Sequence, residues 1–426
     1  MKSLNRVVAL AVFALVASGA AFSQKVFTLV KVPGSSPNTS IAINNGGLVV
    51  VNTGTSNSYK VSVWGRLSGV ENIGLTGTNS GGVAVNNLGD VIGAGDPDSL
   101  GYLQGFVWQP VEGLQWLGSL GGNLSGATGI NDSGAVVGLS YTGAETQHAF
   151  LWTAGGGMQD LTTDLTSIGG ATATAINSSN QVIGYYFPNG SRNTTGFLWT
   201  QDGGWQDLGS TGTLAFSIND SGTVVGQSPF AKGAKHAFSW TQVGGMTDLG
   251  TLGGSVSSAQ SVNNLGWVVG TSLTTSTNGL LHGFLWTPTG GMKDFTVLAG
   301  LGATAQAYSV KVNDFGVVAI STNKGSFLLV PKITSKLTSS KNPSVQGQPV
   351  TLTATLSSIA APPPDGETVQ FVVGSTVIGS ATLTGGVAQL TTSALPVGRD
   401  SIVANYAGDG NFLPTKSAAL KQVVNP

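Results

Sequence analysis

Three histidines, His148, His236 and His282, are the residues of this chain that most directly suggest metal or acid–base chemistry, because imidazole is the commonest metal ligand and titrates near neutral pH. Each of them opens a copy of one recurring segment, written HAFLW, HAFSW or HGFLW. Other copies of that segment place different residues at the same position: Lys60, Gln104, Thr195 and Gly325. A metal site needs several ligands at one point, whereas these histidines occur once per copy of a repeat. We therefore expect a local structural role for them, no metal site and no cofactor.

Two sets of aspartates also recur with the repeat. The first set stands just before the apolar residue of segments such as GMQDL and comprises Asp160, Asp207, Asp248 and Asp294. Acids at equivalent sites of a repeat are usually strand-end partners whose carboxylates accept backbone N–H groups. The second set, Asp132, Asp220 and Asp314, lies in turns that lack the D-x-D/N-x-D/N-G spacing of a calcium loop. Both sets therefore indicate structural roles.

Four acids do not follow the repeat and are the candidates for an enzymatic activity: Asp96, Asp98, Glu145 and Asp164. Glycosidase chemistry needs two carboxyl groups about 5 to 10 Å apart, and the sequence does not show such a pair. No His, Cys or Lys is plainly paired with any of the four either. An enzyme that acts on polysaccharides, a hydrolase or a lyase, is therefore the alternative hypothesis for this chain.

The repeat itself is clearest in a nonapeptide, INDSGAVVG at 130 and INDSGTVVG at 218. Seven copies align on an asparagine that returns every 42 to 50 residues. These asparagines are Asn44, Asn86, Asn131, Asn177, Asn219, Asn263 and Asn313. Each copy holds four short β-prone segments, A to D in chain order, as in ATGIN, AVVG, AFLW and MQDL. Seven such copies predict an all-β, seven-bladed β-propeller at residues 24–332, with an open β-solenoid as the competing geometry.

The N-x-x-G pattern inside the nonapeptide is the chemistry of a tight turn. An Asn side chain can bond its own backbone two residues on, and Gly three residues later supplies the positive φ that closes a hairpin. Six copies have Gly at that place and one has Asn180, the next most tolerant residue of that conformation. Segments A and B therefore form a hairpin in every blade.

The two ends of the repeat region predict how the ring closes. The last copy finishes at residues 327–330 with segment C and has no segment D. The first copy is preceded by an unassigned apolar segment, residues 26–30. If that segment supplies the missing strand of the last blade, the ring closes and leaves no open sheet edge.

The wording of these copies, HAFLWT, GGMTDLGTLGGS and INDSGTVVG, resembles the HAF family of bacterial extracellular repeats. The resemblance covers roughly residues 26–330. It implies an exported bacterial repeat protein, and it implies no settled activity. The first and last copies lack the HAF letters and the LGG, as expected for closing blades.

Residues 333–426 differ in composition and are rich in Thr, Ser and Val. Val350, Leu352, Ala354 and Leu356 alternate with threonines, which predicts a half-buried strand. About seven such strands in this segment predict an immunoglobulin-like β-sandwich. The phrases GQPVTLTATL, GSATLTGGVAQLTT and YAGDGNFLPTKS resemble bacterial Ig-like domains of surface and secreted proteins, which implies a spacer or adhesion module.

The amino terminus predicts export. Lys2 and Arg6 precede an apolar run at residues 7–16 and then small residues, which is the pattern of a signal peptide. We expect residues 1–23 to be removed before Gln24, with cleavage after Ala20 as the alternative. The remaining 16 basic and 19 acidic residues give a net charge of −3, so neither nucleic acid nor an anionic membrane is an expected partner. No second apolar stretch predicts a transmembrane segment, and the absence of Cys excludes disulfides.

The most regular aromatic residues of the chain are expected in its core. Segment C carries Trp64, Trp108, Trp152, Trp199, Trp240 and Trp286. Their spacing follows the blades and their neighbours are apolar, so we expect burial between blades rather than a sugar-stacking array.

The B–C loops vary in length and sequence, and variable loops on a rigid scaffold are where binding usually occurs. Their candidate ligand-binding residues are Tyr102, Tyr141, Tyr185, Tyr186, Phe187, Arg192, Phe230, Lys232 and Lys235. Aromatic rings beside amides and cations suit a glycan or an extracellular protein. The sequence therefore favours a secreted or cell-surface binding protein without enzymatic activity. A purely structural extracellular component is a further alternative.

Overall fold

The computed structural model describes residues 26–36, 39–55, 58–77, 80–97, 101–163, 165, 168–230, 233–275 and 279–426. The predicted signal peptide, residues 1–23, lies outside them. The chain divides into two compact units, one that contains Leu29–Leu329 and one that contains Val330–Pro426 together with the segment that ends at Thr28. Among the residues described, no helix is both long and apolar enough to cross a membrane.

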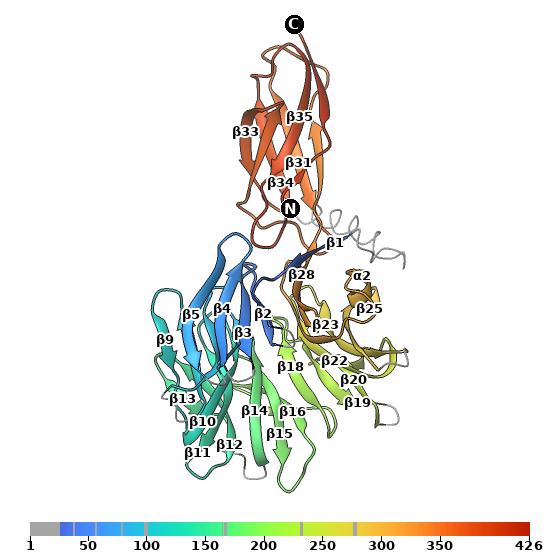
Figure 1. The fold of residues 1–426 in the computed structure, drawn as a ribbon. Helices are drawn as coiled ribbons and strands as arrows, with labels where there is room; N and C mark the ends of the chain where they lie inside the picture. Colours follow the sequence, from blue (N-terminus) through green and yellow to red (C-terminus); the bar gives the residue numbers. More distant parts are fainter. Residues whose placement is uncertain are drawn as a thin grey trace. The chain divides into compact units, whose positions relative to one another are not determined.

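Seven four-stranded sheets form a β-propeller, which confirms the predicted fold (Figure 1). Each sheet holds segments A to D of one repeat copy as neighbouring antiparallel strands. Blade 1 contains β2 (Ile41–Ile43), β3 (Val49–Thr55), β4 (Ser58–Gly65) and β5 (Gly69–Gly77). Blade 2 contains β6 (Gly81–Val85), β7 (Val91–Gly95), β8 (Gln104–Gln109) and β9 (Gly113–Trp116). Blade 3 contains β10 (Gly121–Ile130), β11 (Val136–Thr142), β12 (Gln147–Thr153) and β13 (Gly157–Asp160).

The next three blades repeat this arrangement. Blade 4 contains β14 (Ile168–Ile176), β15 (Val182–Pro188), β16 (Thr195–Thr200) and β17 (Gly204–Leu208). Blade 5 contains β18 (Leu214–Ile218), β19 (Val224–Pro229), β20 (Lys235–Thr241) and β21 (Gly245–Asp248). Blade 6 contains β22 (Gly253–Val262), β23 (Val268–Thr274), β24 (Leu281–Thr287) and β25 (Gly291–Asp294). A short helix, α2 (Phe295–Leu298), follows blade 6 and is capped by the Asp294 side chain.

Blade 7 closes the ring with a strand from the other end of the repeat region. It contains β26 (Ala307–Val312), β27 (Val318–Thr322) and β28 (Gly325–Pro331). Its fourth strand is β1 (Phe27–Lys31), which pairs with β28. The amide of Val32 also donates to the carbonyl of Ser326 at 2.9 Å. The predicted closure by the amino-terminal segment is therefore confirmed.

Large apolar side chains of the C strands fill the spaces between blades. The fully buried phenylalanines are Phe106, Phe150, Phe197, Phe238 and Phe284. Five of the strand-C tryptophans are 6 to 8% exposed and Trp286 is half-buried. In one cluster, Phe150 and Trp152 of blade 3 pack with Ile92 and Val107 of blade 2. The tryptophans are therefore core residues, as predicted.

The last glycine of the nonapeptide makes room for these phenylalanines. Gly138 stands opposite Phe150 in the β11–β12 pair. A Cβ atom on Gly138 would overlap the carbonyl oxygen of Gly126 and lie 2.8 Å from Phe150 Cε1. Blade 1 has the larger residue on the other strand of the pair, because Val51 replaces the glycine of strand B and stands opposite Ser62, which replaces the phenylalanine of strand C. The sequence VVG is thus a packing requirement of the blade.

The second unit is an Ig-like β domain, which confirms the second part of the predicted fold. One sheet contains β29 (Thr334–Ser339), β31 (Val350–Ser357) and β34 (Val387–Thr392). The other contains β30 (Ser344–Val345), β37 (Leu420–Asn425), β35 (Gly398–Tyr406), β32 (Thr368–Val373) and β33 (Thr376–Thr382), with β36 (Thr415–Lys416) beside β35. Val350, Leu352, Ala354 and Leu356 are 0 to 2% exposed, so the predicted face of β31 is the buried one.

Candidate functional site

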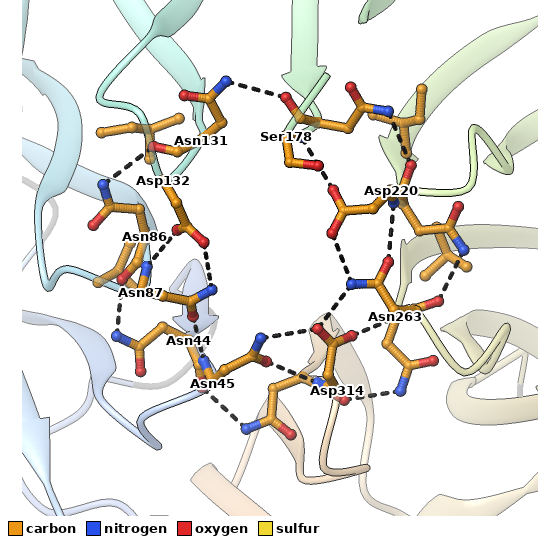
Figure 2. A pocket seen from close by; sticks show the side chains of 18 of the residues that line it. Asn44, Asn45, Asn86, Asn87, Asn131, Asp132, Ser178, Asp220, Asn263 and Asp314 are labelled. Atoms are coloured by element: carbon orange, nitrogen blue, oxygen red, sulfur yellow. Dashed lines mark hydrogen bonds between the residues drawn. The ribbon is translucent and has the colours of Figure 1, made fainter. Parts of the chain in front are cut away.

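The recurring asparagine of each A–B turn joins its blade to the next one. Asn44 Nδ2 donates to the carbonyl of Asn86 at 2.8 Å, and the same bond follows from blade to blade around the ring. Asn313 Nδ2 closes the circle by donating to the carbonyl of Asn44 at 3.0 Å. All seven side chains are buried, at 3 to 6% exposure. We call this ring of seven residues, defined in the sequence by their alignment, the asparagine belt (Figure 2).

The oxygen of each amide bonds the backbone of its own turn. In five copies Oδ1 accepts the N–H two residues on, as predicted. In every copy Oδ1 accepts the backbone N–H four residues on, as Asn44 does from Leu48 at 2.9 Å. The amide side chain offers this acceptor and the inter-blade donor on two separate atoms, which a carboxylate does not. Sequence reasoning predicted the turn and missed the inter-blade bond. The sequence did contain a sign of this bond. Asp or Ser would also be tolerated at this position if the residue only formed the turn, yet all seven copies carry Asn.

The residues that follow the belt form a second polar ring around a cavity of about 200 Å³. They are Asn45, Asn87, Asp132, Ser178, Asp220, Asn264 and Asp314. Amide nitrogens donate to the three carboxylates, as Asn87 Nδ2 does to Asp132 at 2.8 Å (Figure 2). Asn264 Nδ2 likewise donates to Asp220 and to Asp314 at 2.9 Å. Burial raises the pKa of Asp220, but hydrogen bonds from Ser178 and Asn264 outweigh it and hold that pKa below its usual range.

The three carboxylates of this ring therefore accept hydrogen bonds from neighbouring blades and help to link them. Among the residues described, no three His, Cys, Asp or Glu side chains gather closely enough to hold a metal ion. An aliphatic girdle also lines this cavity and consists of Ile43, Val85, Ile130, Ile176, Ile218, Val262 and Val312.

The three histidines pair with the aspartates of their own blades. The Nδ1 atoms lie 2.7 to 2.9 Å from carboxylate oxygens in the pairs His148–Asp160, His236–Asp248 and His282–Asp294. The other carboxylate oxygen accepts a backbone N–H, as Asp160 Oδ1 does from Thr162 at 2.8 Å. Blade 4 has Thr195 in place of His, and there the Tyr186 hydroxyl donates to Asp207 at 3.0 Å. In blades 3, 5 and 6 the start of strand C is thus tied to the end of strand D, and in blade 4 the tie to strand D comes from strand B.

Asp160 gives this pairing a testable pH dependence. Burial raises its pKa, but hydrogen bonds from Thr162 and His148 outweigh burial and leave the pKa below the ordinary value of 3.8. A lowered folded-state pKa contributes stability that is present above the unfolded pKa and lost as the pH falls through the folded one. We expect Asp160→Asn to reduce the free energy of unfolding by about 1 kcal/mol at neutral pH. The difference in the free energy of unfolding between the variant and wild type should narrow as the pH falls below 3.8. Urea unfolding at neutral pH and at a pH below 3.8 measures this effect. A stability difference between the variant and wild type that is the same at the two pH values would contradict the charge-based explanation.

The B–C loop candidates fall into two groups. Tyr186 contacts the Trp205 ring with centroids 6.1 Å apart, and Phe230 stacks on His236 at 6.0 Å, so both take part in packing. Tyr185 and Phe187 lie on the opposite face of β15 from Tyr186, half-exposed. Their rings meet edge to face at 6.1 Å.

The remaining candidates lie in several blades. Tyr102 is 49% exposed before β8, Tyr141 is half-buried on β11, and Arg192 and Lys235 are exposed. Lys232 lies outside the described residues, as do the enzyme candidates Asp98 and Asp164.

Of the other acids, Asp96 accepts the amide of Gly101 at 2.8 Å. Glu145 is exposed in a turn of another blade with φ of 59°.

A second cavity, of about 420 Å³, is lined by the A strands of all seven blades. Six of the blades have a β-bulge in the A strand, which re-aims one side chain. The bulged residues are Val83, Thr128, Thr174, Phe216, Gln260 and Tyr308, and all six line this cavity. Lys311 also lines it, and its Nζ donates to the carbonyl of Gln260 at 3.2 Å. Sequence reasoning did not single out this residue.

Residues 337–425 match the family model described as bacterial Ig-like domain (group 3). The second unit is a bacterial Ig-like domain. Its sheets are held together without any disulfide, because the chain has no Cys. Proteins of this composition must rely on the buried faces of strands such as β31.

No curated protein matches the chain. Among solved structures, it is similar to a streptogramin B lyase, with 14% identity over 73% of this chain and 99% of that chain and a TM-score of 0.49. It is also similar to the propeller domain of the Trilobed protease from Pyrococcus furiosus, with 9% identity, coverage of 79% and 98%, and a TM-score of 0.48. A gluconolactonase from Xanthomonas campestris has 10% identity, coverage of 74% and 92%, and a TM-score of 0.42. These similarities assign no activity to this chain.

Proposed function

We propose that this chain is an exported, non-enzymatic binding protein of the HAF-repeat type, whose propeller recognises a glycan with its B–C loop rim. The Ig-like domain serves as a spacer or adhesion module. The bacterial Ig-like domain and the signal-peptide pattern at residues 1–23 support an extracellular location. We place the two domains at residues 24–332 and 333–426.

The observation that carries this proposal is the aromatic pair at the end of β15. Successive residues of a strand point to opposite faces, so Tyr186 packs on Trp205 while Tyr185 and Phe187 share the other face. Both rings of the pair are half-exposed. Aromatic rings bury large apolar areas, and Tyr adds a hydroxyl that can hydrogen-bond, which suits the C–H faces and hydroxyls of a sugar.

The loop that follows the pair supplies polar groups of the right kind. Asn189, Arg192 and Asn193 are exposed between β15 and β16. Amides donate and accept hydrogen bonds and Arg offers five donors in a fixed fork. Neutral amides with one cation suit a neutral or weakly acidic glycan better than a strongly charged ligand.

The recurring histidines and aspartates are paired with one another inside their blades, which accounts for them as structural residues. In His148, His236 and His282, Nδ1 pairs with the carboxylate of an aspartate in the same blade. Those aspartates also accept hydrogen bonds from backbone amides.

Binding of residues 24–426 to a panel of soluble glycans and cell-wall polymers tests the proposal. We expect the double variant Tyr185→Ala/Phe187→Ala to lose at least about tenfold in affinity, because buried aromatic anchors dominate recognition surfaces. Isothermal titration with the best glycan of the panel measures this loss.

Val243→Ala is the matched control, because Val243 is fully exposed in the C–D turn of blade 5, on the opposite rim. It should bind like wild type. Equal affinity in the double variant, or no glycan binding by wild type, would overturn the proposal and leave an extracellular protein as the ligand class to test. Release of shortened sugars during the titration would favour the hydrolase or lyase alternative.

A further inference from the structure

The cavity lined by the A strands contains one charged side chain among its lining residues, Lys311. Its position is two residues before the belt asparagine. The other six blades have small residues at that position: Ala42, Ala84, Gly129, Ala175, Ser217 and Ser261. Blade 7 therefore departs from the repeat by carrying a long cationic side chain where the other blades carry small residues.

The bulge in blade 7 is displaced as well. In blades 2 to 6 the bulged residue stands three positions before the belt asparagine, as Gln260 does before Asn263. In blade 7 it is Tyr308, five positions before Asn313. Because a bulge shifts which residues face each side of a strand, this displacement accompanies the entry of Lys311 into the cavity.

Among the described residues that line the cavity, none is a carboxylate that could neutralise this cation. The other lining residues are apolar or neutral: Ser40, Ile41, Val83, Thr128, Thr174, Phe216, Ser258, Gln260, Tyr308 and Ser309. Asp220 and Asp314 line the other cavity, beside the aliphatic girdle, and both accept hydrogen bonds from Asn264. One of the three ammonium donors of Lys311 goes to the Gln260 carbonyl. Desolvation lowers the pKa of Lys311, and a charge in such surroundings gains by pairing with an opposite one.

We propose that this cavity binds a small organic carboxylate, with Lys311 Nζ pairing with the carboxylate. The cavity of about 420 Å³ is within the range of small-molecule sites, which combine apolar walls with a few polar groups. Ile41, Val83 and Phe216 supply the apolar walls. The hydroxyl groups of Ser40, Ser258 and Tyr308 make no hydrogen bond within the part of the chain that the structure describes, so they are available to the ligand. Tyr308 is 37% exposed, and the cavity is therefore reachable from solvent.

A single cation among neutral groups favours a monoanion over a phosphate. Lys presents a compact point charge, whereas dianionic phosphates are usually held by Arg forks or by several donors together. The site is separate from the aromatic pair on β15, and the inference does not depend on the proposed glycan recognition.

The test is isothermal titration of residues 24–426 with acetate, benzoate and glucuronate, which differ in size and polarity. We expect saturable binding of at least one of them, and at least tenfold weaker binding to Lys311→Met, which keeps a similar length and removes the charge. Benzamide, the neutral counterpart of benzoate, should bind no more tightly than benzoate binds to Lys311→Met.

Two control variants separate this site from others. Lys324→Met removes another lysine of blade 7, whose Nζ donates to the Leu301 carbonyl at 2.7 Å, and should bind like wild type. The double variant Tyr185→Ala/Phe187→Ala should also bind the carboxylate with wild-type affinity. This result would show that the carboxylate site and the proposed glycan site can fail independently. The midpoint temperature of thermal unfolding should be no lower for Lys311→Met than for wild type. The absence of binding by all three carboxylates, or equal affinity of Lys311→Met, would overturn the proposal.

Discussion

Replacing Gly138 by alanine is expected to destabilise the propeller by about 3 kcal/mol or more. The added Cβ would overlap the backbone carbonyl of Gly126 and lie 2.8 Å from the Phe150 ring. Phe150 is completely buried, so it has no free space into which to move. The obstacle on the other side is backbone of the paired strand β10, which can shift only by breaking the β10–β11 pairing.

Tryptophan fluorescence during urea unfolding measures this loss. All nine tryptophans precede residue 331, so the signal reports on the propeller and not on the Ig-like domain. Gly155→Ala is the control in the same blade, because a Cβ there meets nothing within 4 Å. We expect the free energy of unfolding of Gly155→Ala to lie within about 0.5 kcal/mol of the wild-type value. A Gly138→Ala variant as stable as this control would show that the VVG glycine is not a packing requirement.

Replacing Asn263 by aspartate is expected to cost about 2 to 4 kcal/mol at neutral pH. Asn263 Nδ2 donates to the Asn313 carbonyl at 2.8 Å, and the side chain is 3% exposed. Aspartate would keep the oxygen that accepts from Leu265 and Trp267. It would also bring a carboxylate oxygen against a carbonyl oxygen in the place of the donor. The substitution therefore leaves the turn chemistry intact and breaks one bond of the asparagine belt.

The same fluorescence measurement distinguishes the two roles of this residue. If Asn263 served only its turn, aspartate would be almost neutral, because Asp is a common residue at the start of turns. Asn189→Asp, the same change at an exposed loop position, should fall within about 0.5 kcal/mol of wild type. Similar stabilities of the two variants would remove the belt as a source of propeller stability.

The local roles in this protein were readable from the repeat. The alignment of His148 with Thr195 and Gly325 indicated a structural histidine, and the structure pairs it with Asp160. The missing fourth strand of the last copy indicated closure by the amino-terminal segment, and β1 supplies it. Both inferences succeeded because they depend on bonds within one blade, or between strands that the hydrophobic pattern already identifies.

The ligand candidates show where such reasoning stops. Tyr185, Tyr186 and Phe187 are adjacent in the sequence and were one group there. The structure separates them, because Tyr186 packs on Trp205 and donates to Asp207 while its neighbours face the other side. Which of the two faces of a strand is packed depends on the neighbouring blade, and no local pattern specifies that for a loop end.

The sequence alone determined the all-β class, the number of blades and the Ig-like domain, because hydrophobic alternation, turn residues and period act over short distances along the chain. It also identified the closing strand, because the last copy lacks one strand and an unassigned apolar segment precedes the first copy. Only the tertiary structure decided that the turn asparagines form a continuous belt and that Lys311 enters the cavity between the A strands. Both depend on what seven separate blades place against one another around the ring. A bond from Asn313 to Asn44 joins residues 269 positions apart, and only closure of the ring brings them together.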